Sequence, residues 1–247
     1  MSARGLWRWL LCVSLASAGL PSGVRPALAS ALTVAPVSIE MAPDQMTTSL
    51  TLFNPGKHAV AFQIRAFVWD QQSGDDHLAA TDVLQFSPPL GTLANGASQV
   101  VRLLLRSPAQ GAEASYRILI DQIPPPASPG TVSLVLRMSI PVFAEPAARV
   151  SPDLQWRLDM EAKHLLLVAV NSGGRHEAVR NLALRTADGS SLKVENGALG
   201  YVLAGATRRW DIVLPAAAPA VGTVLKLSAQ TDHGPIDLDV PVAVAKP

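Results

Sequence analysis

Cysteine and aromatic residues are scarce in this sequence, which has one cysteine, Cys12, and 5% aromatic residues among 247. Cys12 lies inside an apolar run that two arginines precede and Ala27-Leu28-Ala29 follows, the pattern of a cleaved secretory signal. We expect residues 1–29 to be that signal, so the mature chain has no thiol. This excludes thiol catalysis, cysteine-bound zinc and disulfides from the mature protein.

Long apolar runs and basic blocks are also missing from the mature chain. The run in the signal is short for a membrane span, and no second span follows, so we expect no stable membrane insertion. Processing removes three basic residues and no acidic one, which leaves 17 basic residues (20 − 3) against 19 acidic residues. Because the mature chain then has a slight negative net charge and no basic patch, nucleic acid is excluded as a partner.

Catalytic and metal-binding patterns are absent as well. The five histidines do not show metal-ligand spacing, and no nucleophile elbow or phosphate-binding glycine loop occurs. The densest polar cluster, Asp-Asp-His at 75–77, is interpreted as part of a solvated loop. Trp210 follows two arginines and begins an apolar strand, so we expect a core residue rather than part of a basic patch. The sequence predicts neither an enzyme nor a metal site.

Proline and glycine, with 20 and 17 residues, interrupt a series of short apolar runs. About seven such runs lie between Leu32 and Phe143, and about eight more follow in the rest of the chain, separated by turn signals. The pattern predicts an all-β protein with two immunoglobulin-like β-sandwich domains joined by a short linker. We expect the domains to span residues 30–146 and 152–247, although no sequence repeat relates them.

The stretch Thr131–Phe143 alternates between apolar and other residues over about twice the length of an ordinary strand. As the last strand of its domain, it is expected at a sheet edge. Such a row can cover its own core, as in any half-buried strand, or can be offered to another chain by strand addition. The apolar row consists of Val132, Leu134, Leu136, Met138, Ile140 and Val142.

Several segments resemble one family. The segments LTVAPVSIEM, LFNPG, RAFVWDQ, FSPPLGTLANGASQVVRL, SYRILIDQIP and RMSIPVF occur in this order between Leu32 and about Pro146. Together they resemble the periplasmic chaperones of the chaperone–usher pilus pathway, and most of all its archaic branch. The resemblance implies two immunoglobulin-like domains, a periplasmic location, and no nucleotide or other cofactor. It also implies two partners, pilus subunits and an outer-membrane usher.

The resemblance further implies a binding site for the pilus subunit. The last strand of the first domain would be lent to a subunit that lacks its own final strand. The usher would then exchange this donor strand for the extension of a neighbouring subunit. The side chains that enter the subunit would be those of Val132, Leu134, Leu136 and Met138.

One departure from the family concerns the C-terminal carboxylate of the subunit. Many members hold this group with an arginine in the first strand and a lysine late in the last strand, where this sequence has Ser38 and Pro141. Neither residue carries a positive charge. Arg137 and Arg117 lie on neighbouring segments and are the candidate substitutes, because a guanidinium binds a carboxylate bidentately. The alternative is that both arginines only solvate strand ends.

Two other classes of protein stay open at this point. An exported β-sandwich module that binds carbohydrate or assists a hydrolase would need an aromatic platform or convergent carboxylates. A pilin-like subunit would need a free N-terminal donor extension and an incomplete fold. The sequence leaves undecided which subunit or usher is the partner and whether the free chain self-associates.

Overall fold

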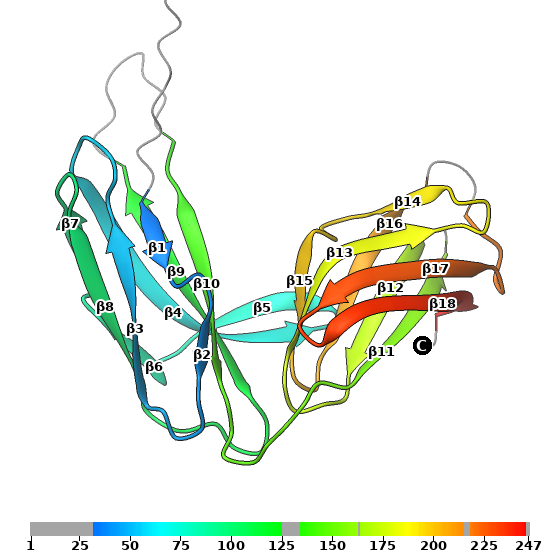
Figure 1. Ribbon diagram of the computed structural model, residues 1–247, viewed down its shortest axis with the longest axis horizontal. Coiled ribbons are helices and arrows are strands. Elements are labelled where there is room, and N and C mark those ends of the chain that lie inside the picture. Colours follow the sequence, from blue (N-terminus) through cyan, green and yellow to red (C-terminus); the bar gives the residue numbers. More distant parts are fainter. Residues whose placement is uncertain (1–31, 125–133, 163, 215–217, 246–247) are drawn as a thin grey trace, which may run out of the picture.

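The computed structural model describes residues 32–124, 134–162, 164–214 and 218–245. These residues form β-strands and loops arranged as two β-sandwich domains that meet at an angle (Figure 1). The predicted fold class, all-β with two immunoglobulin-like sandwiches, is confirmed. Within these four ranges no helix has the length and apolar character needed to cross a membrane.

The N-terminal domain consists of two sheets packed face to face. One sheet has the strand order β1-β3-β8-β6, and the other has the order β2-β10-β9-β4-β5, with β7 paired to β4. Alternating side chains from both sheets fill the core between them, among them Leu50, Ile118 and Val142. The strands are β1 (Thr33–Ala35), β2 (Ile39–Met41), β3 (Thr47–Phe53), β4 (Val60–Gln72), β5 (Asp75–Ala80), β6 (Leu84–Ser87), β7 (Leu90–Leu93), β8 (Ser98–Leu105), β9 (Ala114–Ile123) and β10 (Arg137–Ala144).

The C-terminal domain has one path of eight strands, β14-β16-β12-β11-β18-β17-β13-β15, and β14 also pairs with β13. The sheet therefore folds back on itself around a second core. Trp210 lies in this core, 3% exposed, which confirms the position expected for it. The strands are β11 (Leu154–Glu161), β12 (His164–Asn171), β13 (Glu177–Arg185), β14 (Ser191–Val194), β15 (Leu199–Val202), β16 (Thr207–Val213), β17 (Val224–Thr231) and β18 (Gly234–Val244).

Residues 75–77 do not lie in a loop as predicted, because they begin strand β5, which forms a hairpin with β4. Every side chain of β5 is exposed, so the sequence offers no alternating pattern that could reveal the strand. The hairpin turns at Ser73 and Gly74, whose φ angles are both positive. The carbonyl of Gly74 accepts a hydrogen bond from the backbone of Arg209, and the hairpin reaches the C-terminal domain (Figure 1).

The stretch predicted as one long strand forms a shorter strand in the structure. β10 begins at Arg137, which lies opposite Asp121 of β9. Before that point the antiparallel ladder ends, because β9 stops at Ile123 and the next residue is a proline, which has no N–H to donate. One further bond, from the backbone N–H of Gln122 to the carbonyl of Leu136, continues the pairing. Residues 131–133 lie outside the described part of the chain.

In both domains the last strand pairs in parallel with a strand near the start of the domain over three residues only. β10 runs parallel to β2 at residues 142–144, and β18 runs parallel to β11 at residues 242–244. The earlier part of each strand pairs on one side only, as far as the structure is described. In β18 the exposed residues of this part are Pro235, Asp237, Leu238, Asp239 and Pro241. Proline and charge disfavour an added strand, so the edge of β10 is the more receptive of the two.

A buried asparagine supports the loops at one end of each domain. Asn54 is fully buried, and its amide donates hydrogen bonds to the carbonyls of His58, Leu93 and Ala94. Its Oδ1 accepts a hydrogen bond from the N–H of Gly56. Asn171 occupies the equivalent place in the C-terminal domain, with bonds to three carbonyls and to a glycine N–H two residues later. The two domains therefore share this pattern of hydrogen bonds around a buried asparagine, although their sequences show no repeat.

Replacing Asn54 by alanine is expected to lower the free energy of unfolding by about 2–4 kcal/mol, because three carbonyls lose a buried donor. Urea unfolding followed by tryptophan fluorescence measures the change. Asn95 lies in an exposed turn, and its replacement by alanine should change stability by less than about 0.5 kcal/mol. Equal unfolding midpoints for the two variants would contradict this role of Asn54.

Candidate functional site

The first half of β10 presents an open backbone edge. The backbone N–H and C=O groups of even-numbered residues point toward β9, because the carbonyl of Leu136 accepts a hydrogen bond from the N–H of Gln122. Odd-numbered residues therefore direct their N–H and C=O groups to the opposite side, where β2 covers only the end of the strand. In the described part of the domain, Arg137 and Ser139 each leave an N–H and a C=O on this edge without a strand partner. Such an edge is a template for strand addition.

The apolar row of β10 passes from solvent into the core along the strand. Leu134 is 85% exposed and Leu136 is 41% exposed. Met138 is partly buried against the core of the N-terminal domain, whereas Ile140 and Val142 belong to that core, at 4% and 0% exposure. The same alternating row therefore begins in solvent, beside the open edge, and ends in the core of the N-terminal domain.

Arg137 is part of a surface ion-pair network. Its guanidinium contacts the carboxylate of Asp121, which also accepts a hydrogen bond of 2.7 Å from Arg65. Burial by itself would raise the pKa of Asp121, but the hydrogen bonds from Arg137 and Arg65 outweigh this effect and hold the pKa below its ordinary value of 3.8. Arg137 is therefore already neutralised by a carboxylate within its own domain.

Replacing Asp121 by asparagine is expected to destabilise the protein at neutral pH and to have little effect in acid. The folded-state pKa of Asp121 is depressed, so its contribution to stability is present above the ordinary value of 3.8 and is lost as pH falls through the lower folded-state value. The difference in unfolding free energy between wild type and variant, measured at pH 7 and below pH 3, should shrink accordingly. Asp82, an exposed partner of Arg106, provides the control, and its variant should show a smaller difference. A difference that stays constant with pH would contradict the assignment.

Arg117, the other candidate, lies in a different environment. In β9 it stands directly opposite Pro141, so it occupies the same cross-strand row as the position where the family carries a lysine. Its guanidinium carbon lies 3.6 Å from the ring centroid of Trp69 and 5.5 Å from that of Tyr201. Burial lowers the pKa of Arg117, but an arginine stays protonated at neutral pH. No carboxylate of the described residues lies within ion-pair distance of Arg117, although the more distant Asp76 works against the lowering of its pKa.

An apolar contact joins the two domains next to Arg117. Trp69 and Phe143 of the N-terminal domain pack against Leu203 of the C-terminal domain. Beside them, the amide of Gln71 donates to the carbonyl of Tyr201 at 2.7 Å and accepts from the N–H of Leu203 at 3.1 Å. Because both apolar and polar contacts cross the junction, the angle between the domains is held by the fold itself.

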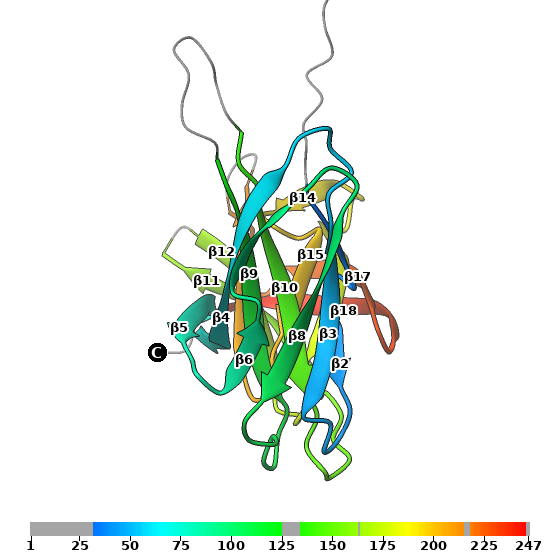
Figure 2. The same ribbon diagram turned by 90° about the vertical axis from the view of Figure 1, so that its left-hand side faces the viewer.

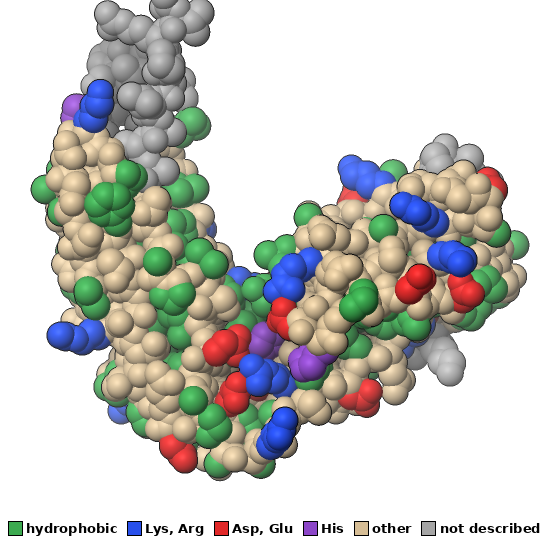
Figure 3. Space-filling view, in the orientation of Figure 1, with side chains coloured by type: hydrophobic (Ala, Val, Ile, Leu, Met, Phe, Trp, Pro, Cys, Tyr) green, Lys and Arg blue, Asp and Glu red, His purple; other side chains and the backbone are tan. Residues whose placement is uncertain are grey.

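A cluster of charged residues completes the junction. Glu113, whose side chain is fully buried, accepts a hydrogen bond from the backbone of His176 and lies 2.8 Å from Nδ1 of the same residue. Arg175 pairs with Glu40 at 3.1 Å and with Glu145 at 2.6 Å. Burial raises the pKa of Glu40, and the nearby His176 works against this rise. Figure 3 shows acidic, basic and histidine side chains gathered where the domains meet.

Glu40, Glu113 and His176 also bring their ligand atoms within 4.8 Å of one another, as a metal site would require. Arg175 neutralises these carboxylates, and Nδ1 of His176 already faces Glu113. An interdomain ion-pair network accounts for this arrangement. Sequence reasoning missed the network because Glu113 and His176 are 63 residues apart in the chain and belong to different domains.

The sequence of the first domain matches a known family. Residues 31–149 match the family model described as pili and flagellar-assembly chaperone, PapD N-terminal domain. The N-terminal domain is thus similar in sequence to the PapD-type pilus chaperones. Of the predicted donor side chains, Leu134 and Leu136 lie just before β10 and Met138 lies within it, whereas Val132 lies outside the described residues.

Solved structures are similar to this chain over both domains. One comes from the CsuC–CsuE chaperone–tip adhesion subunit pre-assembly complex of the archaic chaperone–usher Csu pili of Acinetobacter baumannii. It is 22% identical, with a TM-score of 0.66 and coverage of 88% of this chain and 100% of that chain. The YadV chaperone is 14% identical, with a TM-score of 0.61 and coverage of 85% and 98%.

A third similar structure is the Salmonella enterica SafA pilin in complex with the SafB chaperone, which is 15% identical, with a TM-score of 0.58 and coverage of 85% and 97%. At these identities the likeness shows the two-domain fold. A comparison with curated protein sequences found no match.

Proposed function

We propose that the mature protein is a periplasmic chaperone that binds pilus subunits by donor-strand complementation and delivers them to an outer-membrane usher. The observation that carries the proposal is the half-open edge of β10, with Leu134 and Leu136 exposed beside it, in a PapD-type domain. Complexes of similar chaperones with a tip adhesion subunit and with a pilin support the same role. The protein is then a binding protein and not an enzyme.

Strand addition on β10 has a defined geometry. A strand of the subunit would form hydrogen bonds with the N–H and C=O groups that Arg137 and Ser139 direct to the open edge. The hydrophobic interior of the subunit would accept the side chains of Leu134 and Leu136. Met138 would follow at the border of the chaperone core, and Val132 would extend the row at the other end. Each leucine contributes on the order of 1.5–3 kcal/mol when buried, and each ladder bond adds roughly 0.5–1.5 kcal/mol. Ordering and association costs subtract from this sum.

The first candidate for binding the C-terminal carboxylate of the subunit is Arg117, and the second is Arg137. Arg117 is half-buried, has no internal carboxylate partner in the described chain, and lies opposite Pro141. Arg137 would have to exchange its contact with Asp121 for the new carboxylate. A subunit chain that ends near the domain junction would therefore meet Arg117 without breaking an existing ion pair.

We further propose a branch of the family, a cellular compartment and domain boundaries for this chain. The order of motifs and the likeness to an archaic Csu complex favour the archaic branch. The signal pattern in residues 1–29 favours export to the periplasm. The domains are proposed to extend over residues 30–146 and 152–247.

Purification of the tagged mature chain from periplasm tests the function. The expected result is one-to-one capture of a small β-rich exported subunit whose fold lacks its own final strand. A glycan-binding screen should show no carbohydrate ligand. Sedimentation of the free chain determines whether it self-associates. Carbohydrate binding without capture of any subunit would instead support the alternative, an exported carbohydrate-binding module.

A further inference from the structure

The β4–β5 hairpin extends beyond its own sandwich. Residues 61–68 of β4 pair with β9, and residues 67–72 pair with β5. In Figure 2, β5 lies at the margin of the N-terminal domain, and Figure 1 shows the hairpin reaching the C-terminal domain. All six side chains of β5 are exposed, and none of them belongs to the core of the described N-terminal domain. β5 therefore contributes little to the fold of its own domain, and its contacts with the other domain need an explanation.

Gln71 binds the edge of a strand in the other domain. Its side-chain amide donates a hydrogen bond of 2.7 Å to the carbonyl of Tyr201 and accepts one of 3.1 Å from the N–H of Leu203. β15 pairs with β13 along its other side. One donor and one acceptor on the free side are what a neighbouring strand would supply. The side chain of Gln71 therefore takes the place of a short strand and extends the sheet of the C-terminal domain.

Asp76 of β5 fixes the orientation of this amide. Its Oδ1 accepts hydrogen bonds of 3.0 Å from the amide of Gln71 and from the indole N–H of Trp69. The same oxygen lies 2.8 Å from Nη1 of Arg208, which belongs to β16. Both hydrogens of the Gln71 amide are then used, one toward Asp76 and one toward Tyr201. Asp76 thus joins β4 of one domain to β16 of the other.

The tip of the hairpin is shaped for contact with β16. Gly74 is buried, although the side chains that follow it in β5 are exposed. Its carbonyl accepts a hydrogen bond of 3.1 Å from the N–H of Arg209. A Cβ atom at Gly74 would lie 2.4 Å from Cγ of Arg209, and the φ angle of +93° also disfavours any other residue. The backbone of the tip therefore packs directly on the C-terminal domain in a way that a glycine permits.

We infer that the β4–β5 hairpin is an arm that sets the angle between the two domains, and that Gln71 and Asp76 are positioning residues for Arg117. The guanidinium carbon of Arg117 lies 3.6 Å from the ring centroid of Trp69 and 5.5 Å from that of Tyr201, one ring from each domain. Asp76 holds the first ring by its N–H, and Gln71 holds the backbone that carries the second ring. The role of the arm in the angle is independent of any partner, whereas the role toward Arg117 rests on the proposed function.

Distances between two spin labels, measured by pulsed EPR, test the arm. The only cysteine, Cys12, lies in the expected signal, so cysteines introduced at Asn95 and Ala187 can carry the labels. Both are exposed turn residues, one in each domain. The labelled chain without further changes should give one narrow distance distribution. Gln71→Met and Gly74→Val should each broaden it about two-fold or more, since relative domain motion is expected where few contacts cross an interface.

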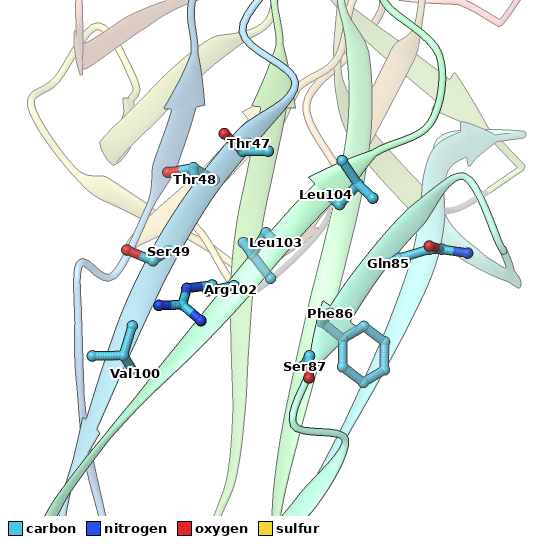
Figure 4. A pocket seen from close by; sticks show the side chains of 10 residues that line it. All are labelled: Thr47, Thr48, Ser49, Gln85, Phe86, Ser87, Val100, Arg102, Leu103 and Leu104. Atoms are coloured by element: carbon cyan, nitrogen blue, oxygen red, sulfur yellow. The ribbon is translucent and has the colours of Figure 1, made fainter.

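Gln72→Met supplies the matched control. It is the same substitution one residue further along the chain, and the side-chain amide of Gln72 bonds to Asp70 within its own domain. Its distance distribution should match that of the unchanged chain. The groove lined by residues of β3, β8 and β6 lies on the opposite sheet (Figure 4), so NMR shifts of its amides report whether the sandwich of each variant is intact.

Distributions of Gln71→Met and Gly74→Val as narrow as that of the control would overturn the role of the arm. The apolar contact at Leu203 and the ion pairs of Arg175 would then set the angle without the hairpin.

Subunit binding tests the role toward Arg117. Gln71→Met should weaken binding of the purified subunit about ten-fold, but only about two-fold or less in the Arg117→Met background. Additive losses would overturn the positioning of Arg117. If the unchanged chain captures no subunit, the proposed function is wrong, while the label distances still decide whether the hairpin sets the angle.

Discussion

Replacing Leu134 by glutamate is expected to abolish capture of a pilus subunit while the chaperone still folds. Leu134 is 85% exposed in the free chain, so the substitution should change folding stability by less than about 0.5 kcal/mol. In the complex the same position would lie in the hydrophobic interior of the subunit, where an unpaired carboxylate costs several kcal/mol. Leu136→Glu should have the same effect on capture. Co-purification after co-expression in the periplasm, together with unfolding curves of the free variants, measures both quantities.

Val135 supplies the matched control for these variants. It is 54% exposed and lies between the two leucines, but on the opposite face of the chain. Val135→Glu introduces the same charge within one residue and should retain the subunit. If all three variants capture the subunit as well as wild type does, donor-strand complementation by this segment is wrong. If all three lose it equally, charge near the edge and not the apolar row is responsible.

Replacing Arg117 by methionine is expected to weaken the complex by at least about 100-fold, because the carboxylate of the subunit would be left buried without its cation. Methionine removes the guanidinium that lies over the ring of Trp69 but keeps an apolar side chain of similar length, so the variant tests the charge while the space stays filled. Arg137→Gln should have a smaller effect, since Asp121 already engages that guanidinium. Equilibrium binding of the purified subunit to each variant provides the comparison.

A double-mutant cycle identifies the group that Arg117 binds. The C-terminal segment of the captured subunit is made as two peptides, one with a free C-terminal carboxylate and one with an amide. If Arg117 holds this carboxylate, amidation should weaken binding to wild type and have little further effect on the Arg117→Met variant. Additive losses would show that Arg117 acts elsewhere, and a larger coupling for Arg137 would move the assignment to that residue.

The alternating row in residues 131–143 shows how far sequence reasoning reached. Alternation reveals that one face is apolar, because side chains of a strand point to opposite faces in turn. It does not reveal that Ile140 is buried while Leu134 is exposed. That difference depends on where the partner strand β9 ends and on how few residues β2 covers, and both depend on the register between distant segments.

The two arginines show the same limit for charge. Sequence proximity made Arg137 and Arg117 equal candidates, since both lie near the donor strand. The fold separates them, because Asp121 is brought opposite Arg137 while the row of Arg117 contains Pro141 and the ring of Trp69 lies beneath its guanidinium.

By itself, the sequence determined the all-β class, the two sandwiches, the location of the apolar row and the family resemblance. These features follow from residue type and from spacing over a few positions, which local backbone geometry translates directly into structure. Only the tertiary structure decided which part of β10 has an open edge and which contacts hold the two domains together. It also decided which of Arg117 and Arg137 has an ion-pair partner among the described residues. Those properties arise from contacts between residues far apart in the chain, and local spacing carries no information about such contacts.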